Sequence, residues 1–514
     1  MHPEKTPDGN AGAWISNPQQ PADSGTGGSR SGTKSNWPEW CVLSAYAALV
    51  ACAIPYHEPW ADEAQSWELA RTLPLGILFK TYVRYEASPG LWHFLLWVLS
   101  QAHVSYTGLH WICGAIAVAS TYLLVRNSPL PRYLRLTLPF TYFLIFQYAV
   151  VARSYVLVPP LLFMIAMGWK KRPLLVAVLL GLLANTSLHA AIISGGLALV
   201  FGMVQITDGT REDRHGVRNL PLFAAIVLGF YAFAIWTAWP PPDFLHTISN
   251  FRSESQSFAV AVIQSMVWGI CEPWLLAIPF WIAIALWFHA RRSLIYLLPV
   301  LLFAIFSGAV HVNWWHAGLL VPLVACLLWI TWPAPGIAAS RYESIGRGAL
   351  LFVIVVQFLW SGYALVFDHY RAYSPDLATA RFLKPYVESG GQIAVTFLGK
   401  PPEDHDFWAV GIQPYFNHNI YMNQSESFWW WSDKNQTEAQ FLGLLSSHPH
   451  VVLAEMLAQY YGQPVDMNNA KVRLILGSGY RLTNVFCGVQ PQRLAPGPAN
   501  CHLIFQYPDD HPAN

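Results

Sequence analysis

The segment HEPWADEAQSWELAR, residues 57–71, follows directly on the first strongly apolar stretch of the chain. It concentrates ionisable side chains where a first membrane helix would end: His57, Glu58, Asp62, Glu63 and Glu68. Apolar residues recur through and just beyond it at helical spacing: Trp60, Trp67, Leu69 and Leu73. This spacing predicts a helix lying on a membrane surface, with carboxylates at the mouth of a membrane-embedded region.

The composition of the whole chain is typical of a membrane protein. Of its 514 residues, 54% are hydrophobic and only 11% are charged, whereas soluble domains carry about 25% charged residues. The formal net charge of +1 gives no sign of nucleic-acid binding. We therefore predict an all-α polytopic membrane domain of about 11–13 transmembrane helices, followed by a small extracytoplasmic α/β domain.

Apolar stretches that can serve as membrane spans recur along residues 39–367. We place them at 39–56, 107–125, 134–151, 154–169, 173–186, 188–206, 220–239, 273–290, 293–310, 316–333 and 348–367. One more stretch, 90–104, would give an even number of crossings. We interpret it as a juxtamembrane or re-entrant helix.

Positively charged residues collect in alternate connections between these spans. The clusters are Arg126, Arg132 and Arg135; Lys170, Lys171 and Arg172; Arg211, Arg214 and Arg218; Arg291 and Arg292; Arg341 and Arg347. Cytoplasmic loops of membrane proteins are enriched in Lys and Arg. The pattern therefore predicts a cytoplasmic N-terminus and an extracytoplasmic C-terminal part, which requires an odd number of spans.

Three regions follow from this organisation. Residues 1–38 are rich in Gly, Pro, Ser and Asn and predict a disordered cytoplasmic tail. Residues 39–367 form the membrane domain, with 57–90 as its first extracytoplasmic loop. Residues 368–514 predict an α/β domain, with helices near 374–387 and 437–445 and strands at 391–397, 451–456, 480–486 and 502–507.

Two features of the C-terminal part bear on its environment. Cys487 and Cys501 form a plausible disulfide, which would need an oxidising compartment. Three consecutive tryptophans, 429–431, predict either a platform for a sugar or a lipid interface, or a local hydrophobic core.

The carboxylates of the opening segment have a structural and a chemical interpretation. In the structural one, Asp62 caps the helix and Glu63 is a first-turn acid that suits the helix dipole. In the chemical one, a carboxylate at the lipid–water boundary acts as a general base on an acceptor hydroxyl that attacks an anomeric carbon. We favour the chemical interpretation, because polar groups at membrane depth usually line a cavity or pathway.

Such a reaction needs groups that receive a leaving phosphate. The candidates on the predicted outer face are Arg84, Arg153, His189, His311 and His316. Structural alternatives exist for each kind: Arg153 can snorkel from a helix end, His189 can form an interhelical hydrogen bond, and Arg84 can pair with Glu86. Further candidates for the site are His57, Glu58, Tyr85, Glu86 and Tyr155. The histidine spacing does not predict a compact zinc site.

The order of these motifs resembles that of the GT-C glycosyltransferases, close to the protein mannosyltransferase and aminoarabinose transferase group. Asp62-Glu63 match the Asp-Glu pair that opens the first loop in that superfamily. The segment 85–92 (YEASPGLW) is similar to its Pro-Pro-Leu-Tyr region, with Gly90 for the second Pro. The segment 151–155 (VARSY) resembles Glu-Ala-Arg-x-Tyr without the Glu, and 315–319 (WHAGL) resembles a late Arg-His motif with Trp for Arg.

The resemblance, which covers roughly residues 50–370, implies a GT-C fold, a polyprenyl-phosphate-linked sugar donor and inversion at the anomeric carbon. Asp62 maps onto the catalytic carboxylate, with Glu63 as its supporting neighbour. We expect no required cofactor, although Asp62, Glu63 and Glu86 offer oxygen ligands of the kind that Mg²⁺ or Mn²⁺ prefers. The acceptor is a glycan, a lipid or a protein, and the expected location is a bacterial inner membrane.

Two other function classes compete with this one. A transporter or flippase of a lipid-linked solute would show inverted repeats and charges near the bilayer midplane, and neither is evident. A non-catalytic GT-C-like scaffold is compatible with the departures at Val151 and Trp315. Substitution of Asp62 by Asn discriminates between enzyme and scaffold, because a scaffold should tolerate it.

Overall fold

The computed structural model describes residues 36–209, 219–244, 257–272, 274–334, 340–398, 408–431, 437–458 and 463–508. Nearly all of the predicted N-terminal tail and the arginine cluster at 211–218 lie outside these residues.

Apolar helices make up most of the described chain before residue 370. Five are long and apolar enough to cross a membrane: α6 (Tyr106–Asn127), α10 (Leu188–Gly209, apolar over Leu188–Thr207), α12 (Leu220–Ala238), α17 with α18 (Trp314–Ala317 and Leu320–Thr331) and α19 (Arg341–Tyr370). Six apolar stretches are shorter: α1 (Trp37–Ala53), η4 with α8 (Ser154–Leu157 and Val158–Gly168), α9 (Pro173–Ala184), α14 (Phe258–Trp268), α15 (Trp274–Ala290) and η5 with α16 (Leu294–Leu297 and Leu298–Ala309). The predicted fold class, a helical integral membrane domain with a small C-terminal sheet, is confirmed.

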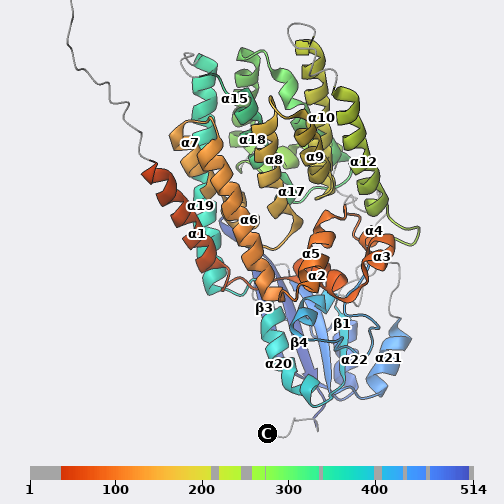
Figure 1. The fold of residues 1–514 in the computed structure, drawn as a ribbon. Helices are drawn as coiled ribbons and strands as arrows, with labels where there is room; N and C mark the ends of the chain where they lie inside the picture. The colour runs from red at the N-terminus through yellow and green to blue at the C-terminus, as the bar shows by residue number, and fades with distance from the viewer. Residues whose placement is uncertain are drawn as a thin grey trace, which may run out of the picture.

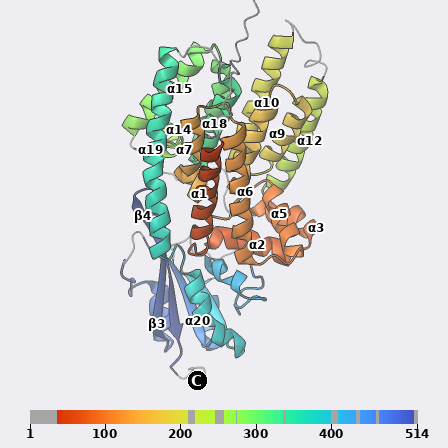
Figure 2. The same cartoon turned by 60° about the vertical axis from the view of Figure 1, so that its left-hand side comes forward.

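The long helices run alongside one another, and the C-terminal sheet lies at one end of the bundle (Figure 1). Between bundle and sheet lies a layer of short helices: α2 (Ala61–Thr72), α3 (Leu75–Ile77), η1 (Leu78–Tyr82), α4 (Val83–Tyr85) and α5 (Leu91–Gln101). The view in Figure 2 shows α19 reaching from the far end of the bundle to the sheet. Its 30 residues span about 45 Å, more than the hydrocarbon core of a bilayer.

The prediction of a regular helix over 134–151 is wrong. This segment consists of α7 (Arg132–Thr137), a 3₁₀ turn η2 (Leu138–Phe140) and a π turn η3 (Phe143–Gln147), followed by turns. Pro139 lacks a backbone N–H and cannot continue the helix. The carbonyl groups released by the break are satisfied from neighbouring helices, since Tyr46 donates to Leu144 O (2.6 Å) and Ser361 to Phe140 O (2.7 Å).

Two other apolar segments refine the predicted spans. Residues 258–268, which lie in a predicted loop, form the apolar helix α14. Residues 91–101 form α5, whose 11 residues are too few to cross a bilayer, in agreement with the juxtamembrane interpretation. Helix α14 thus replaces 134–151 in the set of apolar helices.

The C-terminal part is a three-layer structure around a four-stranded sheet of order β1-β2-β4-β3. The strands are β1 (Ile393–Phe397), β2 (Val451–Ala458), β3 (Arg481–Gln492) and β4 (Ala495–Gln506), and only β1 and β2 are parallel. Helix α20 (Asp376–Glu388) and the 3₁₀ segment η6 (Trp408–Tyr415) pack on one face. Helices α21 (Glu438–Ser446) and α22 (Ala470–Gly477) pack on the other. The predicted helices and strands are confirmed, and α22 was not predicted.

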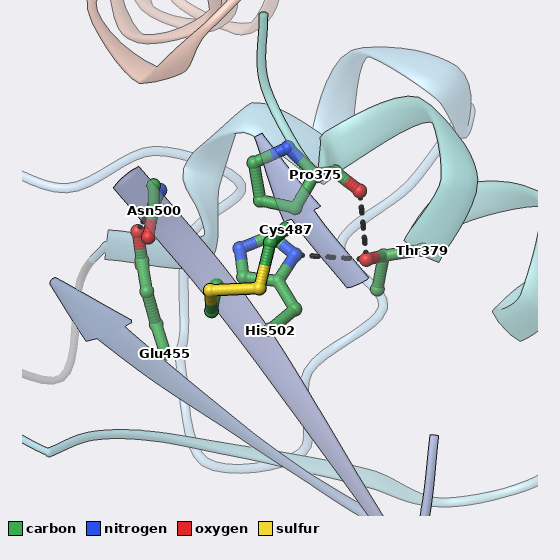
Figure 3. Close-up of a disulfide and its surroundings, with 7 residues drawn as sticks. Pro375, Thr379, Glu455, Cys487, Asn500 and His502 are labelled. Atoms are coloured by element: carbon green, nitrogen blue, oxygen red, sulfur yellow. Dashed lines mark hydrogen bonds between the residues drawn. A yellow bond between two sulfur atoms is a disulfide. The ribbon is translucent and has the colours of Figure 1, made fainter. Parts of the chain in front are cut away.

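Alternation along β2 explains the two hydrophobic layers. Val451 and Leu453 pack toward α20, whereas Val452 and Ala454 pack toward α21 and α22. Both faces of a strand buried in this way must be apolar. Cys487 and Cys501 are directly paired across β3 and β4 and form a disulfide, as Figure 3 shows. The predicted pairing is therefore confirmed.

Candidate functional site

Helix α2 points the two carboxylates of the Asp-Glu pair in different directions. The helix is preceded by Trp60, whose backbone N–H donates to Glu63 Oε1 (3.2 Å). The structural interpretation of Asp62 as the N-cap is therefore wrong, because Trp60 occupies that position. Consecutive helical residues are about 100° apart around the axis, so Asp62 faces a cavity while Glu63 faces the protein interior.

The cavity beside Asp62 has a volume of about 300 Å³ and lies between the short-helix layer, the bundle and the C-terminal part. Seven of the predicted site residues line it: Asp62, Glu86, Arg153, Tyr155, His189, His311 and His316. These residues come from α2, from the connection between α4 and α5, from η4 and the residue before it, from α10, and from the residues between α16 and α18. The structure thus brings together predicted residues that are up to 254 positions apart in sequence, since Asp62 and His316 line the same cavity.

Arg153 is the one Lys or Arg among the described residues that line the cavity. Its guanidinium forms an ion pair with Asp62, and both side chains are partly exposed. The same group lies over the rings of Trp60 and Tyr155, at 5.8 and 5.6 Å from their centroids. Burial would lower the pKa of Arg153, but the carboxylate of Asp62 raises it above its usual value. The cavity therefore holds a carboxylate and a permanent cation in contact.

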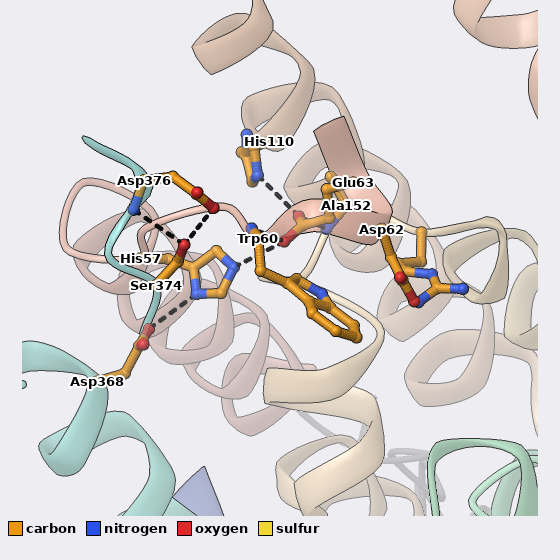
Figure 4. Close-up of polar contacts among 10 residues, drawn as sticks. His57, Trp60, Asp62, Glu63, His110, Ala152, Asp368, Ser374 and Asp376 are labelled. Carbon is orange, nitrogen blue, oxygen red and sulfur yellow. Dashed lines mark hydrogen bonds and ion pairs between the residues drawn. The ribbon is translucent and has the colours of Figure 1, made fainter. Parts of the chain in front are cut away.

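Glu63 is held by four hydrogen bonds from three segments of the chain (Figure 4). Its Oε1 accepts from Trp60 N (3.2 Å) and His57 Nε2 (3.3 Å), and its Oε2 accepts from His110 Nε2 (3.0 Å) and Ala152 N (2.6 Å). Burial would raise the pKa of Glu63, but the hydrogen bonds and charges of the two imidazoles hold it below the usual value. Glu63 is thus a positioning residue that fixes α2 against α6 and the loop before Arg153.

His57 connects Glu63 to the end of α19. Its Nδ1 lies 3.1 Å from Asp368 Oδ2 while its Nε2 faces Glu63. Carboxylates only accept hydrogen bonds, so both ring nitrogens carry protons and the ring is an imidazolium. Burial would lower the pKa of His57, but Asp368 and Glu63 raise it to about 10. The first loop and the last membrane helix are therefore joined by a buried charge.

We expect this imidazolium to make thermal stability fall as pH rises. His57 has a folded-state pKa of about 10 against an ordinary value of 6.5, so its contribution is complete below pH 6.5. It decreases above that pH and is lost as pH rises through about 10. The contribution of His57 is measured by thermal melting of the detergent-solubilised protein between pH 6 and pH 10. His110 and Tyr373 are the titratable groups whose rings lie against that of His57.

The variant His57→Gln should lose most of this pH dependence, whereas His289→Gln, at an exposed position on α15, should retain it. Identical pH profiles for the wild type and His57→Gln would show that His57 is not the charged group.

The structure also allows a test of metal-ligand geometry. Within the described part of the chain, donor atoms of His57, Glu63 and His110 lie within 4.8 Å of one another, a set that a divalent cation could use. Among these three residues the positive charge is already supplied by the His57 imidazolium, since both of its ring nitrogens carry protons and one of them donates to Asp368. The carboxylates considered for Mg²⁺ or Mn²⁺ have other partners: Asp62 pairs with Arg153, and Glu86 accepts from Gln65 (3.1 Å).

Two of the histidines that line the cavity, His189 and His316, differ in what they can offer a ligand. His189 donates from Nε2 to His311 O (2.9 Å), so its available nitrogen is an acceptor. His316 accepts from Asn313 N at Nδ1 (3.0 Å), so its proton is on Nε2 and available as a donor. The rings of His189 and His316 stack at 4.1 Å between centroids. Of this pair, His316 is the one suited to a phosphate oxygen.

Other predicted residues lie outside the cavity lining. Arg84 donates from Nε to Trp239 O (2.8 Å), and Tyr85 donates to Asp243 (2.8 Å). The alternative pairing of Arg84 with Glu86 is not observed. Glu58 lies near Arg381, and burial raises its pKa. The expectation that Arg84 contacts the donor phosphate is not supported by its position.

Several cavity residues were not predicted. Gln65 forms paired hydrogen bonds with the backbone of Trp429, at 364 residues' separation, which brings Trp429 and Trp431 over the cavity. Trp429 also packs against Ala61 and Val410, in agreement with the interpretation of a local core, and the interpretation as a platform for a sugar stays a prediction. His93 lines the cavity from α5. The sequence does distinguish His93 in one respect, because it is the only ionisable residue in the apolar helix α5.

Comparisons with known proteins now define the class of fold. No family model matches the chain, and no curated protein shows significant similarity to it. Two crystal structures share the architecture of this chain. Both are of the aminoarabinose transferase ArnT from Cupriavidus metallidurans, one bound to undecaprenyl phosphate and one in the apo state.

Each comparison has a TM-score of 0.52 at 10% sequence identity and covers 91% of this chain and 98% of ArnT. At this identity the likeness is one of fold. The resemblance inferred from the motifs is confirmed at that level.

Proposed function

We propose that this protein is a membrane glycosyltransferase that moves a sugar from a polyprenyl-phosphate-linked donor to an acceptor on the extracytoplasmic side. The observation that carries the proposal is the Asp62–Arg153 pair in a cavity at the end of the helical bundle. It occurs within a fold shared with ArnT, which has been crystallised with undecaprenyl phosphate.

The geometry supports a direct displacement. Asp62 accepts the proton of an acceptor hydroxyl as its oxygen forms a bond to the anomeric carbon. The bond between that carbon and the phosphate oxygen breaks, and polyprenyl phosphate leaves. Attack from the face opposite the phosphate inverts the anomeric configuration. The ion pair with Arg153 fixes the position of the Asp62 carboxylate before the reaction.

The leaving phosphate is received by donors on the cavity wall. One nitrogen of Arg153 contacts Asp62, and the guanidinium has further N–H groups for phosphate oxygens. The Nε2–H of His316 supplies a neutral donor beside it. Tyr155 packs on His316 at 5.7 Å between ring centroids and keeps it oriented.

The sidedness of the proposal rests on the charged end of the bundle. Arg132 and Arg135 pair with Glu39 at the start of α1 (2.7 and 3.0 Å). Arg291 pairs with Glu343 at the start of α19. These ends lie opposite the sheet (Figure 1), and enrichment in positive charge favours a cytoplasmic location for them. The cavity and the disulfide-bonded sheet are then extracytoplasmic, as in a bacterial inner membrane.

The proposal is tested with purified protein and radiolabelled undecaprenyl-phosphate sugars, with and without chelator. We expect release of undecaprenyl phosphate and transfer to a glycan, lipid or protein acceptor, independent of added metal. Arg153→Gln should lose at least about tenfold in affinity for undecaprenyl phosphate. Lys384→Gln, at an exposed position on α20, should not.

The competing classes give different results in the same assay. A transporter would move the lipid-linked sugar across a proteoliposome membrane without cleaving its phosphate ester. Intact donor in every reaction, together with no binding of undecaprenyl phosphate, would refute the glycosyltransferase proposal.

A further inference from the structure

His93 is a buried polar side chain with no hydrogen-bond partner among the described residues. It lies in the first turn of α5, is 3% exposed, and has neither ring nitrogen bonded. The ring nevertheless lines the cavity that contains Asp62 and Arg153. Buried polar groups in folded proteins are nearly always hydrogen-bonded, and the exceptions concentrate where function requires them. The position of His93 therefore points to a ligand.

The chemistry of the ring narrows what that ligand offers. Burial and the nearby charge of Arg153 lower the pKa of His93 to about 4, so the ring is neutral near pH 7. A neutral imidazole presents one N–H donor and one nitrogen acceptor. A phosphate oxygen accepts but cannot donate at neutral pH, whereas a hydroxyl group does both. The ring is thus better matched to hydroxyl groups than to phosphate.

A second fixed polar group lies in the same wall. Glu86 accepts a hydrogen bond from Gln65 Nε2 (3.1 Å), and Gln65 is itself held by the backbone of Trp429. Glu86 lines the cavity with an orientation set by this chain of contacts. Burial raises the pKa of Glu86 to about 7, so its carboxyl group accepts hydrogen bonds from hydroxyls and, in its protonated form, also donates one. The indole of Trp92, also in the lining, adds an aromatic surface next to His93.

The position of these groups relative to Arg153 identifies the hydroxyl-bearing molecule. His93 and Glu86 line the same cavity as Arg153, whose guanidinium is proposed to bind the donor phosphate. The group bonded to that phosphate is the sugar to be transferred. A ring attached to a phosphate at Arg153 would therefore come within reach of His93 and Glu86.

We infer that His93 and Glu86 form the subsite that recognises the hydroxyl groups of an uncharged donor sugar. The inference rests on the proposed function and extends it to a substrate class. A neutral hexose or pentose satisfies the imidazole without introducing an unpaired charge.

The subsite is tested by the affinities of the full-length protein for lipids with and without a sugar. The probes are undecaprenyl phosphate and its glucose, mannose and arabinose esters. We expect the wild type to bind one of the esters more tightly than undecaprenyl phosphate. His93→Leu should lose about tenfold in affinity for that ester and stay within about twofold of the wild type for undecaprenyl phosphate.

Matched variants separate recognition from folding. His93→Gln keeps a donor and an acceptor and should recover most of the affinity for the ester. Since His93 has no partner to lose, His93→Leu should melt at or above the temperature of the wild type. His289→Gln, exposed on α15, should match the wild type in both measurements.

The binding and melting measurements distinguish a failure of the proposed function from a failure of the subsite alone. A wild type that binds none of the lipids overturns the proposed function and this inference with it. A wild type that binds them while His93→Leu keeps full affinity for the ester overturns the subsite alone. The same conclusion follows if His93→Leu loses both kinds of lipid equally or melts at a lower temperature, because either result would show a structural role.

Discussion

Asp62→Asn is expected to reduce the rate of sugar transfer by about 10²–10⁴-fold, the usual contribution of a general base. The amide has nearly the same shape as the carboxylate and keeps an oxygen for the guanidinium of Arg153, but it cannot take a proton from the acceptor. Because the change removes the base and leaves the cavity intact, binding of undecaprenyl phosphate should change little. The measurement is kcat for transfer from a polyprenyl-phosphate sugar, alongside donor affinity.

Two comparisons make the result specific. Asp62→Glu restores a base at a displaced position and should recover part of the rate. Asp466→Asn, at an exposed position in the C-terminal part, should leave the rate unchanged. A kcat within about threefold of the wild type in Asp62→Asn would rule out general-base catalysis by this residue.

Glu63→Gln should destabilise the protein by about 3–5 kcal/mol, as expected when one partner of a buried ionic network is removed. The carboxylate accepts four hydrogen bonds, two on each oxygen. An amide has one oxygen, so its NH₂ group would face donors from either His57 and Trp60 or His110 and Ala152. It would also leave the imidazolium of His57 with Asp368 as its one carboxylate partner in this network. Thermal melting in detergent measures the loss.

Glu68 provides the matched control on the same helix. It is also fully buried, but its ion pair is with Arg71 alone (2.7 Å). Burial raises the pKa of Glu68 to about 7, against the charge of Arg71, so the neutral form is already populated near pH 7. Glu68→Gln should therefore cost about 1 kcal/mol. Equal destabilisation by the two substitutions would contradict the role assigned to the Glu63 network.

The membrane spans could be read from the sequence because each depends on a local quantity. A helix in a bilayer satisfies its backbone internally, so a run of about 20 apolar residues is sufficient to indicate it. Two segments are exceptions: 258–268 forms the unpredicted α14, and 134–151 contains Pro139 and departs from the α-helix where Tyr46 and Ser361 satisfy its carbonyls. Those donors are 98 and 221 residues away, so no local window could have revealed them. Strands and the cysteine pair of the C-terminal part were likewise evident from local patterns.

Local sequence patterns determined only part of the candidate site. The motif order placed Asp62, Arg153 and His316 on one side of the membrane, and the structure puts all three around one cavity. It did not distinguish His189, whose donor is used by a backbone carbonyl, from His316, whose donor is available. Tautomers depend on hydrogen-bond partners, and partners are a property of the folded chain.

What the sequence by itself determined is the class of fold, the end of the bundle that carries the candidate site, and the presence there of the Asp62-Glu63 pair. Only the tertiary structure decided that adjacent Asp62 and Glu63 have separate roles, one in a cavity with Arg153 and one sealed among histidines. The physical reason is that hydropathy is summed along the chain. Burial, protonation and hydrogen bonding are instead set by whichever distant residues the fold brings into contact.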